Sequence, residues 1–194
     1  MTPDSYPVGI LALQGDYQKH RQVLEALSVP STEVRRPDDF DRIGRLIVPG
    51  GESTTILELL GRLKLEEPFQ RFITTRPVWG TCAGMVLLAA TINNSTQKVF
   101  GAIDIAVDRN GYGRQYFSTV APARFSLNGC DRSLDLVFIR APRVTRVGSR
   151  VQVLLTWNGD PVLLAQDKVL VSSFHPELSG STALHEYFVR KFHP

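Results

Sequence analysis

The chain has 194 residues, of which 43% are hydrophobic and 21% charged, and its formal net charge is +3. A chain of this length and composition buries one good core, so we expect a single domain over residues 1–194. Two cysteines are too few for a disulfide framework, which fits a reducing compartment, and the mild charge argues against nucleic acid as a partner.

The N-terminal segment contains no basic leader region and no long apolar core. Its apolar run, residues 8–13, is too short for a secretory leader or a membrane span, so we expect a cytoplasmic protein without membrane contact. The run predicts a buried parallel strand, and Asp16 is expected to cap a helix that extends to Leu27. His20 falls on the apolar face of this helix, which predicts packing rather than catalysis.

Short strands are also predicted at residues 31–34 and 46–48, with a loop at 35–39. The second strand leads into Gly50 and Gly51, which allow a ligand to approach the backbone closely. No Gly-Lys-Ser/Thr sequence follows, so this is not a phosphate-binding loop. We expect it to present backbone N–H groups at the carboxyl edge of the sheet. Two amphipathic helices are predicted next, the first by Ile56, Leu59, Leu60 and Leu63 and the second by Leu65, Phe69, Phe72 and Ile73.

Residues 78–84 read Val-Trp-Gly-Thr-Cys-Ala-Gly and precede an apolar run. This is the Gly-x-nucleophile-x-Gly pattern of a nucleophile elbow, a strained turn from strand to helix. The turn would place the Cys82 sulfur at a helix N-terminus, which favours the thiolate, and leave the Ala83 N–H free to hold an oxyanion. A buried structural thiol is the alternative interpretation.

The second half is rich in strands. We predict them at residues 103–107, 115–121, 134–139, 151–156, 162–166 and 169–174, with antiparallel hairpins at the turns 110–111 and 158–159. A final amphipathic helix carries Leu184, Phe188 and Phe192 on one face. The pattern as a whole predicts a three-layer, flavodoxin-like α/β fold: a mostly parallel sheet flanked by helices and extended by antiparallel strands.

Six arginines and no lysine lie within residues 124–150. They alternate with apolar strand residues and lack an interleaved aromatic series, which favours a solvated sheet edge or a protein interface over a nucleic-acid surface. Cys130 matches no functional pattern and is expected to pack.

A cysteine nucleophile needs a base and a group that orients it. His175 directly follows an apolar strand, which places it at the same sheet edge as Cys82, and Glu177 is two residues further on. A carboxylate on one ring nitrogen would fix the imidazole tautomer and turn the other nitrogen to the thiol. Taken alone, the His-Pro-Glu segment also fits a histidine at a strand end beside an exposed glutamate.

The segments 80–84 and 175–177 together resemble the class I, or triad, glutamine amidotransferases. Further matches at 9–16, 49–53, 109–115, 138–142 and 173–178 resemble one branch of that group, the glutaminase subunits of pyridoxal 5'-phosphate synthase. The matches run in order over nearly the whole chain. The resemblance implies hydrolysis of L-glutamine to L-glutamate and ammonia, and ammonia transfer for vitamin B6 synthesis.

The resemblance also implies a role for each matching residue. Cys82 would attack the glutamine carboxamide, His175 would shuttle protons and Glu177 would orient His175. The N–H groups of Gly51 and Ala83 would form the oxyanion hole. The glutamine site would be lined by Gly51, Glu52, Ser53, Arg109, Ile139 and Arg140. An arginine suits the carboxylate of a free amino acid, although Arg140 also fits a strand-edge arginine paired with Asp135.

This chemistry requires neither a metal nor an organic cofactor. The resemblance implies a (βα)8-barrel synthase subunit as partner in a hetero-oligomer, with the helix at 16–27 and the arginine-rich segment as candidate contact surfaces. Two alternatives remain from the sequence: a thiol peptidase or esterase on a similar sheet, and a catalytically idle binding subunit. Turnover of free glutamine separates them from a glutaminase.

Overall fold

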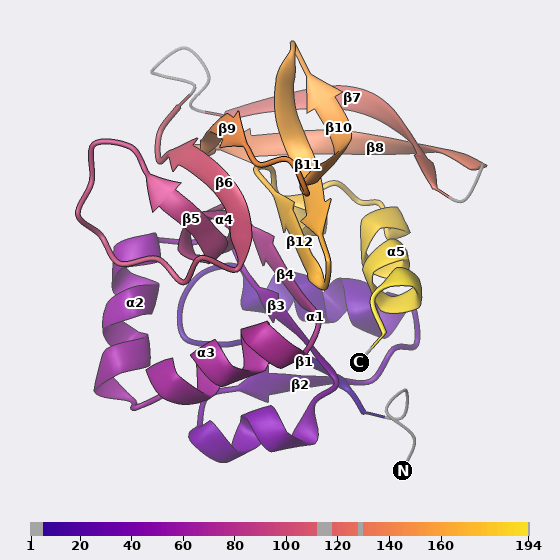
Figure 1. Ribbon diagram of the computed structural model, residues 1–194. Coiled ribbons are helices and arrows are strands. Elements are labelled where there is room, and N and C mark those ends of the chain that lie inside the picture. Colours follow the sequence, from indigo (N-terminus) through magenta and orange to yellow (C-terminus); the bar gives the residue numbers. More distant parts are fainter. Residues whose placement is uncertain (1–5, 112–117, 128–129, 194) are drawn as a thin grey trace.

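A seven-stranded sheet forms the middle layer of the protein (Figure 1), whose computed structural model describes residues 6–111, 118–127 and 130–193. The strand order is β10-β11-β12-β4-β3-β1-β2. The strands are β1 (Val8–Leu11), β2 (Ser31–Val34), β3 (Arg45–Val48), β4 (Val78–Thr81), β10 (Gln152–Trp157), β11 (Asp160–Gln166) and β12 (Val169–Ser172). The pairs from β12 to β2 are parallel, whereas β10, β11 and β12 pair antiparallel. The predicted mostly parallel sheet with an antiparallel extension is confirmed.

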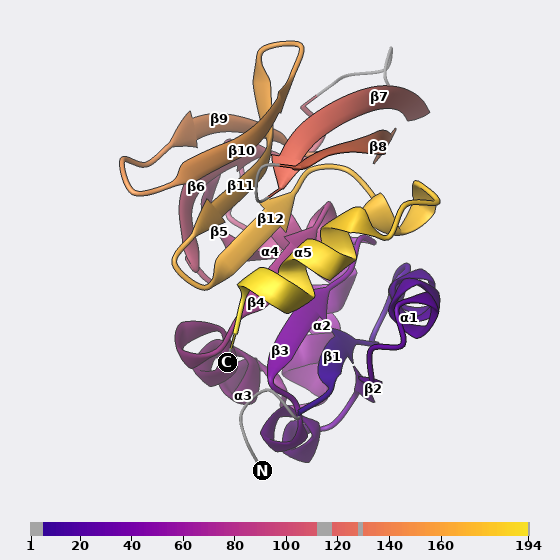
Figure 2. The same ribbon diagram turned by 90° about the vertical axis from the view of Figure 1, so that its right-hand side faces the viewer.

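Helices cover both faces of this sheet (Figure 2). They are α1 (Tyr17–Ala26), α2 (Ser53–Arg62), α3 (Glu66–Thr75), α4 (Ala83–Leu88) and α5 (Ala183–Lys191). Alternate strand residues supply the two cores because successive side chains of a strand point to opposite faces. Ile47 and Trp79 pack with the α1 and α5 side, and Leu46 and Val78 pack with α2, α3 and α4. The three predicted layers are therefore present.

Two smaller sheets lie beside the carboxyl end of the main sheet (Figure 1). One contains β5 (Ala89–Ile92), β6 (Ile103–Asp108) and β9 (Arg143–Val147), and the other is the two-stranded ribbon of β7 (Ser118–Leu127) and β8 (Cys130–Ile139). The backbone N–H of His175 donates to the carbonyl of Val137 at 2.8 Å, which ties the ribbon to the main sheet.

Several local predictions were wrong. The expected loop at 35–39 includes the start of a 3-10 helix, Pro37–Arg42. The apolar run after Cys82, for which no helix end was predicted, forms α4 up to Leu88 and continues as β5. Strand β9 was not predicted. The turn at 110–111 does not close a hairpin, because β6 pairs with β5 and β9. The hairpin at 158–159 is confirmed, with positive φ at both turn residues.

Further predictions concern single side chains, the start of one strand and membrane contact. Leu63 is 46% exposed, so it does not extend the apolar face of α2. Asp16 occupies the N-cap position of α1 without a side-chain capping bond. The start of the strand predicted at 115–121 lies outside the described residues, as does the side chain of Cys130. In the part of the chain that the structure describes, no helix is long and apolar enough to cross a bilayer.

The elbow fits against β3 only because position 84 is a glycine. A Cβ atom on Gly84 would collide with the carbonyl oxygen of Val48, and one on Gly80 would lie 2.5 Å from the Gly84 carbonyl carbon. Neither contact is with a flexible side-chain end, so the backbone itself would have to shift. The glycines therefore set how closely strand and helix approach.

We predict that Gly84→Ala lowers the free energy of unfolding by about 1–3 kcal/mol, as overpacking against backbone does. Gly61→Ala is the control, because Gly61 lies in α2 with nothing within 4 Å of an added Cβ. It should leave stability unchanged or raise it by up to about 1 kcal/mol. Urea unfolding of both variants tests the comparison, and equal effects would contradict it.

Candidate active site

Cys82 occupies the turn between β4 and α4 with φ 47° and ψ −103°. This conformation is sparsely populated for a residue with a side chain, so the surrounding structure must hold it. The backbone N–H of Cys82 donates to the carbonyl of Ser172 on β12 at 2.8 Å. The residue is 6% exposed, and Ala83 begins the helix, so its N–H has no intrahelical acceptor.

His175 and Glu177 reach the same place from the end of β12. The His175 ring lies next to Cys82, since a Cβ on Gly50 would contact both side chains, and its Nδ1 lies 2.7 Å from Glu177 Oε1. Both side chains are almost completely buried, and Glu177 lies in a 3-10 turn, Pro176–Leu178. With Nδ1 on the carboxylate, Nε2 is the ring nitrogen left for the thiol. The structure thus brings together the three residues that the sequence singled out.

The imidazole of His175 is held in a charge-stabilising environment. Burial lowers its pKa, but the hydrogen bonds to Cys82 and Glu177 and the negative charges of both raise it, with a net pKa of about 10. The protonated form is therefore favoured at neutral pH. The protonated His175 stabilises the folded protein. This contribution is fully present at a pH below 6.5, the ordinary pKa of histidine, and is lost as the pH rises through about 10.

The glycine loop after β3 lies directly against this pair. A Cβ on Gly50 would collide with the His175 ring and lie 3.3 Å from the Cys82 Cβ, so only a glycine allows this approach. The Gly50 carbonyl accepts the N–H of Asp16 at 3.1 Å. The Glu52 N–H donates to Gln14 Oε1 at 2.8 Å, so the loop is held from the end of β1.

Two arginines from different segments converge on Glu52. Arg140 Nη1 lies 3.6 Å and Arg109 Nη2 4.0 Å from its carboxylate. Arg140 has φ 46° and follows Ile139, whose carbonyl lies 3.8 Å from Cys82 Sγ. The predicted glutamine-site residues are therefore gathered around the elbow although they are far apart in the sequence.

Ser53 begins α2 directly after this loop. Its side chain is buried, and its hydroxyl is hydrogen bonded to Gln97 Oε1 at 3.2 Å. The hydroxyl therefore faces a neighbour that the sequence did not suggest.

Sequence reasoning missed the contribution of the β1–α1 connection. Gln14 holds the loop, and Asp16 Oδ2 lies 3.6 Å from His175 Nδ1. Both residues follow a predicted parallel strand, so their position at the carboxyl edge was the available signal. His20 is fully buried, as predicted, but its Nε2 lies 3.4 Å from Glu177 Oε2.

Asp16, His175 and Glu177 form a group whose possible ligand atoms lie within 4.8 Å of one another. The group has the donor types of a metal site. The Nδ1 of His175, however, is already held by Glu177 at hydrogen-bond distance. The arrangement therefore suits the orientation of an imidazole.

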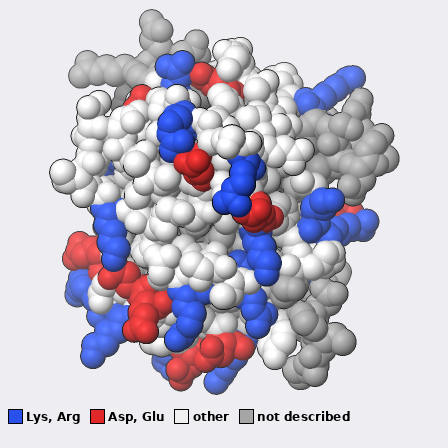
Figure 3. All heavy atoms as spheres, in the orientation of Figure 1, with Lys and Arg blue, Asp and Glu red and all other residues white. Residues whose placement is uncertain are grey.

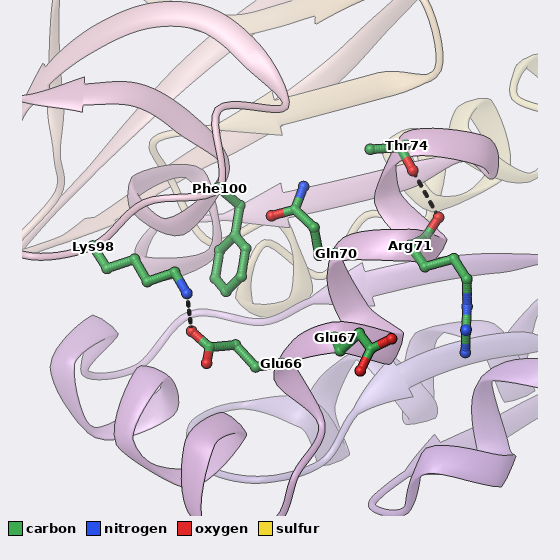
Figure 4. A pocket seen from close by; sticks show the side chains of 7 residues that line it. All are labelled: Glu66, Glu67, Gln70, Arg71, Thr74, Lys98 and Phe100. Carbon is green, nitrogen blue, oxygen red and sulfur yellow. Dashed lines mark hydrogen bonds and ion pairs between the residues drawn. The ribbon is translucent and has the colours of Figure 1, made fainter.

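A surface pocket of about 410 Å³ lies elsewhere, between α3 and the segment that leads to β6 (Figure 4). Glu66 and Lys98 form an ion pair at its edge, and the Phe100 ring forms part of its wall. None of the predicted site residues lines it.

The six arginines of the arginine-rich segment are exposed, and several of their guanidinium groups meet carboxylates. Arg143 lies 3.0 Å from Asp160, and Arg146 lies 2.7 Å from Asp104. On the face in Figure 3, acidic side chains lie beside many of the basic ones. A paired surface of this kind differs from the unbalanced basic stripe that nucleic-acid binding uses.

Comparison with known proteins agrees with this geometry. Residues 10–194 match the model of the SNO glutamine amidotransferase family. The chain belongs to this family. It is 49% identical over 183 residues to the pyridoxal 5'-phosphate synthase subunit PdxT of Koribacter versatilis, with 94% of each chain covered. It is 43% identical to the PdxT subunit of Thermosipho africanus, over 94% of this chain and 96% of that one.

A solved structure described as a glutamine amidotransferase has the same fold. Its TM-score is 0.86 at 40% identity, with 94% of this chain and 96% of that chain covered. The resemblance read from the sequence is therefore confirmed at the level of the family and the fold. A cysteine at a strained elbow beside a buried His–Glu pair supplies the nucleophile, the base and the group that orients the base, as expected for a triad glutamine amidotransferase.

We predict that Glu177→Gln lowers the pKa of His175, because the hydrogen bond and the charge of Glu177 both raise it. The loss of the imidazolium on raising the pH should then begin at lower pH than in the unaltered protein. Nuclear magnetic resonance titration of the His175 ring measures this midpoint. Glu25→Gln, a change of an exposed carboxylate on α1, is the control and should leave it in place. An unchanged midpoint in Glu177→Gln would contradict the assignment.

Proposed function

We propose that residues 1–194 act as one glutaminase domain, which hydrolyses L-glutamine to L-glutamate and ammonia through a thioester on Cys82. The observation that carries this proposal is the grouping of Cys82 beside His175, which is hydrogen bonded to Glu177, at the carboxyl edge of the sheet. Membership of a glutamine amidotransferase family supplies the substrate class.

In the proposed first half-reaction, Cys82 Sγ, whose proton has passed to His175, attacks the side-chain amide carbon of glutamine, and the C=O electrons move to oxygen. The N–H groups of Gly51 and Ala83 bind the resulting oxyanion. His175, protonated at neutral pH, gives a proton to the amide nitrogen, and the C–N bond breaks to release ammonia and leave a thioester.

In the second half-reaction a water molecule attacks the thioester carbonyl, and His175 accepts its proton. The same oxyanion hole serves again. The C–S bond then breaks, which releases glutamate and restores the Cys82–His175 pair. Glu177 keeps the imidazole in one tautomer through both steps.

The charges around Glu52 suit the other end of the substrate. A free amino acid carries an ammonium group and a carboxylate on the same carbon. We assign the ammonium to Glu52 and the carboxylate to Arg109 and Arg140, whose guanidinium groups lie 3.6–4.0 Å from Glu52. Ser53 and Ile139 complete the wall beside them. The residue that a peptidase or esterase cleaves does not carry a free ammonium and a free carboxylate on one carbon, so the arrangement favours glutamine over those alternatives.

The ammonia would pass to a synthase subunit that makes pyridoxal 5'-phosphate. The relatives named as subunits of that synthase support this assignment, because their name implies a second subunit. We propose a (βα)8-barrel partner in a hetero-oligomer. The helix α1 and the arginine-rich strands are the candidate contact surfaces.

The Gly50–Gly51 peptide is a place where such a partner would control activity. The Gly50 carbonyl accepts the Asp16 N–H at the start of α1. Because the peptide is planar, this hydrogen bond also fixes the direction of the Gly51 N–H. Reversal of this peptide would break one hydrogen bond, at a net cost of about 0.5–1.5 kcal/mol. A partner that contacts α1 can therefore set whether the Gly51 N–H serves the oxyanion hole.

We predict that Cys82→Ala abolishes glutamine turnover, because no other group forms the thioester. A glutamine-like electrophile should label Cys82 alone, as peptide mapping by mass spectrometry will show. Cys130→Ala is the matched control and should keep both turnover and labelling. Labelling at Cys130, or turnover by Cys82→Ala, would overturn the proposed function, and so would an unaltered protein that fails to turn over glutamine with its partner present.

We further predict that the synthase subunit raises glutamine turnover by about 10²–10³-fold, the cost of one missing oxyanion donor. Turnover is measured with and without that subunit. The complex that contains Cys82→Ala should assemble and should make pyridoxal 5'-phosphate only when an ammonium salt is supplied. Full turnover by the isolated chain, unchanged by the partner, would contradict the coupling.

A further inference from the structure

A pair of histidines lies behind the catalytic group and has no part in the chemistry described so far. His20 on α1 and His185 on α5 are both fully buried, and His20 Nδ1 lies 2.9 Å from His185 Nε2. The Trp79 ring packs edge-on against both imidazoles, at centroid distances of 5.8 and 4.9 Å. An apolar pair would fill this space at lower cost, because buried polar groups must be desolvated.

The pair touches the catalytic group through Glu177. That carboxylate uses Oε1 for His175, whereas its Oε2 is buried and forms no hydrogen bond in the structure. His20 Nε2 lies 3.4 Å from Oε2 and 3.3 Å from the hydroxyl of Thr81. A buried carboxylate oxygen without a donor is costly, so the tautomer of His20 decides whether Glu177 is fully satisfied.

Each ring holds one proton, since burial lowers the pKa of His185 to about 3, and burial with the nearby His185 and His175 lowers that of His20. In one arrangement His185 Nε2–H donates to His20 Nδ1, and His20 Nε2–H faces Glu177 Oε2. His185 Nδ1 is then a bare lone pair, which fits its lack of a partner. In the opposite arrangement it is a buried N–H without an acceptor, and His20 turns a lone pair towards Glu177. The first arrangement leaves neither histidine with an unsatisfied N–H.

We propose that His20 is a positioning residue for the triad: it donates from Nε2 to Glu177 Oε2, in the tautomer that His185 fixes. Glu177 is then held at both oxygens, by His175 and by His20. This keeps Oε1 on His175 Nδ1 and the other imidazole nitrogen on Cys82. The inference rests on the proposed glutaminase function and extends it to the contact between α1, α5 and the catalytic base.

The test compares two substitutions at position 20 in the complex with the synthase subunit. His20→Leu removes the donor and should lower kcat about 10–100-fold, the usual effect of losing such a supporting bond, with KM little changed. His20→Gln keeps an N–H for Glu177 and an oxygen for His185, so it should restore most of kcat. A change in KM equal to the change in kcat, or a kcat of His20→Gln as low as that of His20→Leu, would overturn the proposal.

Leu24→Val is the control for packing effects. It changes a residue that is fully buried on the same helix and has no polar partner. It should lower the Tm while kcat stays close to that of the unaltered protein, with every variant assayed well below its Tm. If it lowers kcat as much as His20→Leu does, the effect belongs to the helix and the positioning role is wrong.

A double-mutant cycle with Glu177→Gln completes the test. If His20 acts through Glu177, His20→Leu should cost little further kcat once Glu177 is replaced. Additive losses would overturn the proposal. Cys82→Ala in the same assay separates the two claims: turnover by this variant would refute the glutaminase mechanism, whereas an inactive Cys82→Ala beside a fully active His20→Leu refutes only the positioning role.

Discussion

The site depends on the parallel pairing of β4 with β12. Thr81 lies opposite Ser172, and the next N–H, that of Cys82, donates to the Ser172 carbonyl. Because both strands run in the same direction, the residues that follow them leave the sheet at the same edge. Cys82 and His175 are neighbours for this reason alone, although 92 residues of chain separate them. The β4–β12 hydrogen bonds set the distance between Cys82 and His175, and the other residues of the site are arranged around this pair.

The remaining contacts offset the free-energy cost of backbone strain at Cys82 and of burying polar side chains beside it. Cys82 is held at an unfavourable φ and ψ, and a histidine and a glutamate are buried beside it. The glycine loop approaches this pair without a side chain, and the β7–β8 ribbon is fastened to the His175 backbone through Val137. Each element that touches the triad thus comes from a different part of the chain, which holds the strained turn in place.

Much of this could be predicted from local sequence, and the reasons for the failures are physical. Strands β1, β3, β4 and β12 are continuous apolar runs that end in glycine or polar residues, so both the parallel sheet and the edge that carries Cys82 and His175 were predictable. The run that forms α4 and β5 is uniformly apolar, and such a run has no period that tells helix from strand. Arg143–Val147 became a strand through its partner β6, which no local pattern reveals. His20 was correctly predicted to be buried, but its contact with Glu177 depends on how α1 lies on the sheet.

The strand order also determines when the main sheet can be completed during translation. The half of the sheet that is translated first, β1 to β4, ends in β4, and the partner of β4 on its far side is β12 near the other end of the chain. Until residues 169–172 have left the ribosome, β4 is an open edge that includes Trp79, the kind of edge that invites wrong pairing. The thiol also has no base during that time. A nascent chain therefore completes the β4–β12 pairing and brings His175 to the Cys82 thiol in the same late step, so the thiol has no base while the polypeptide grows.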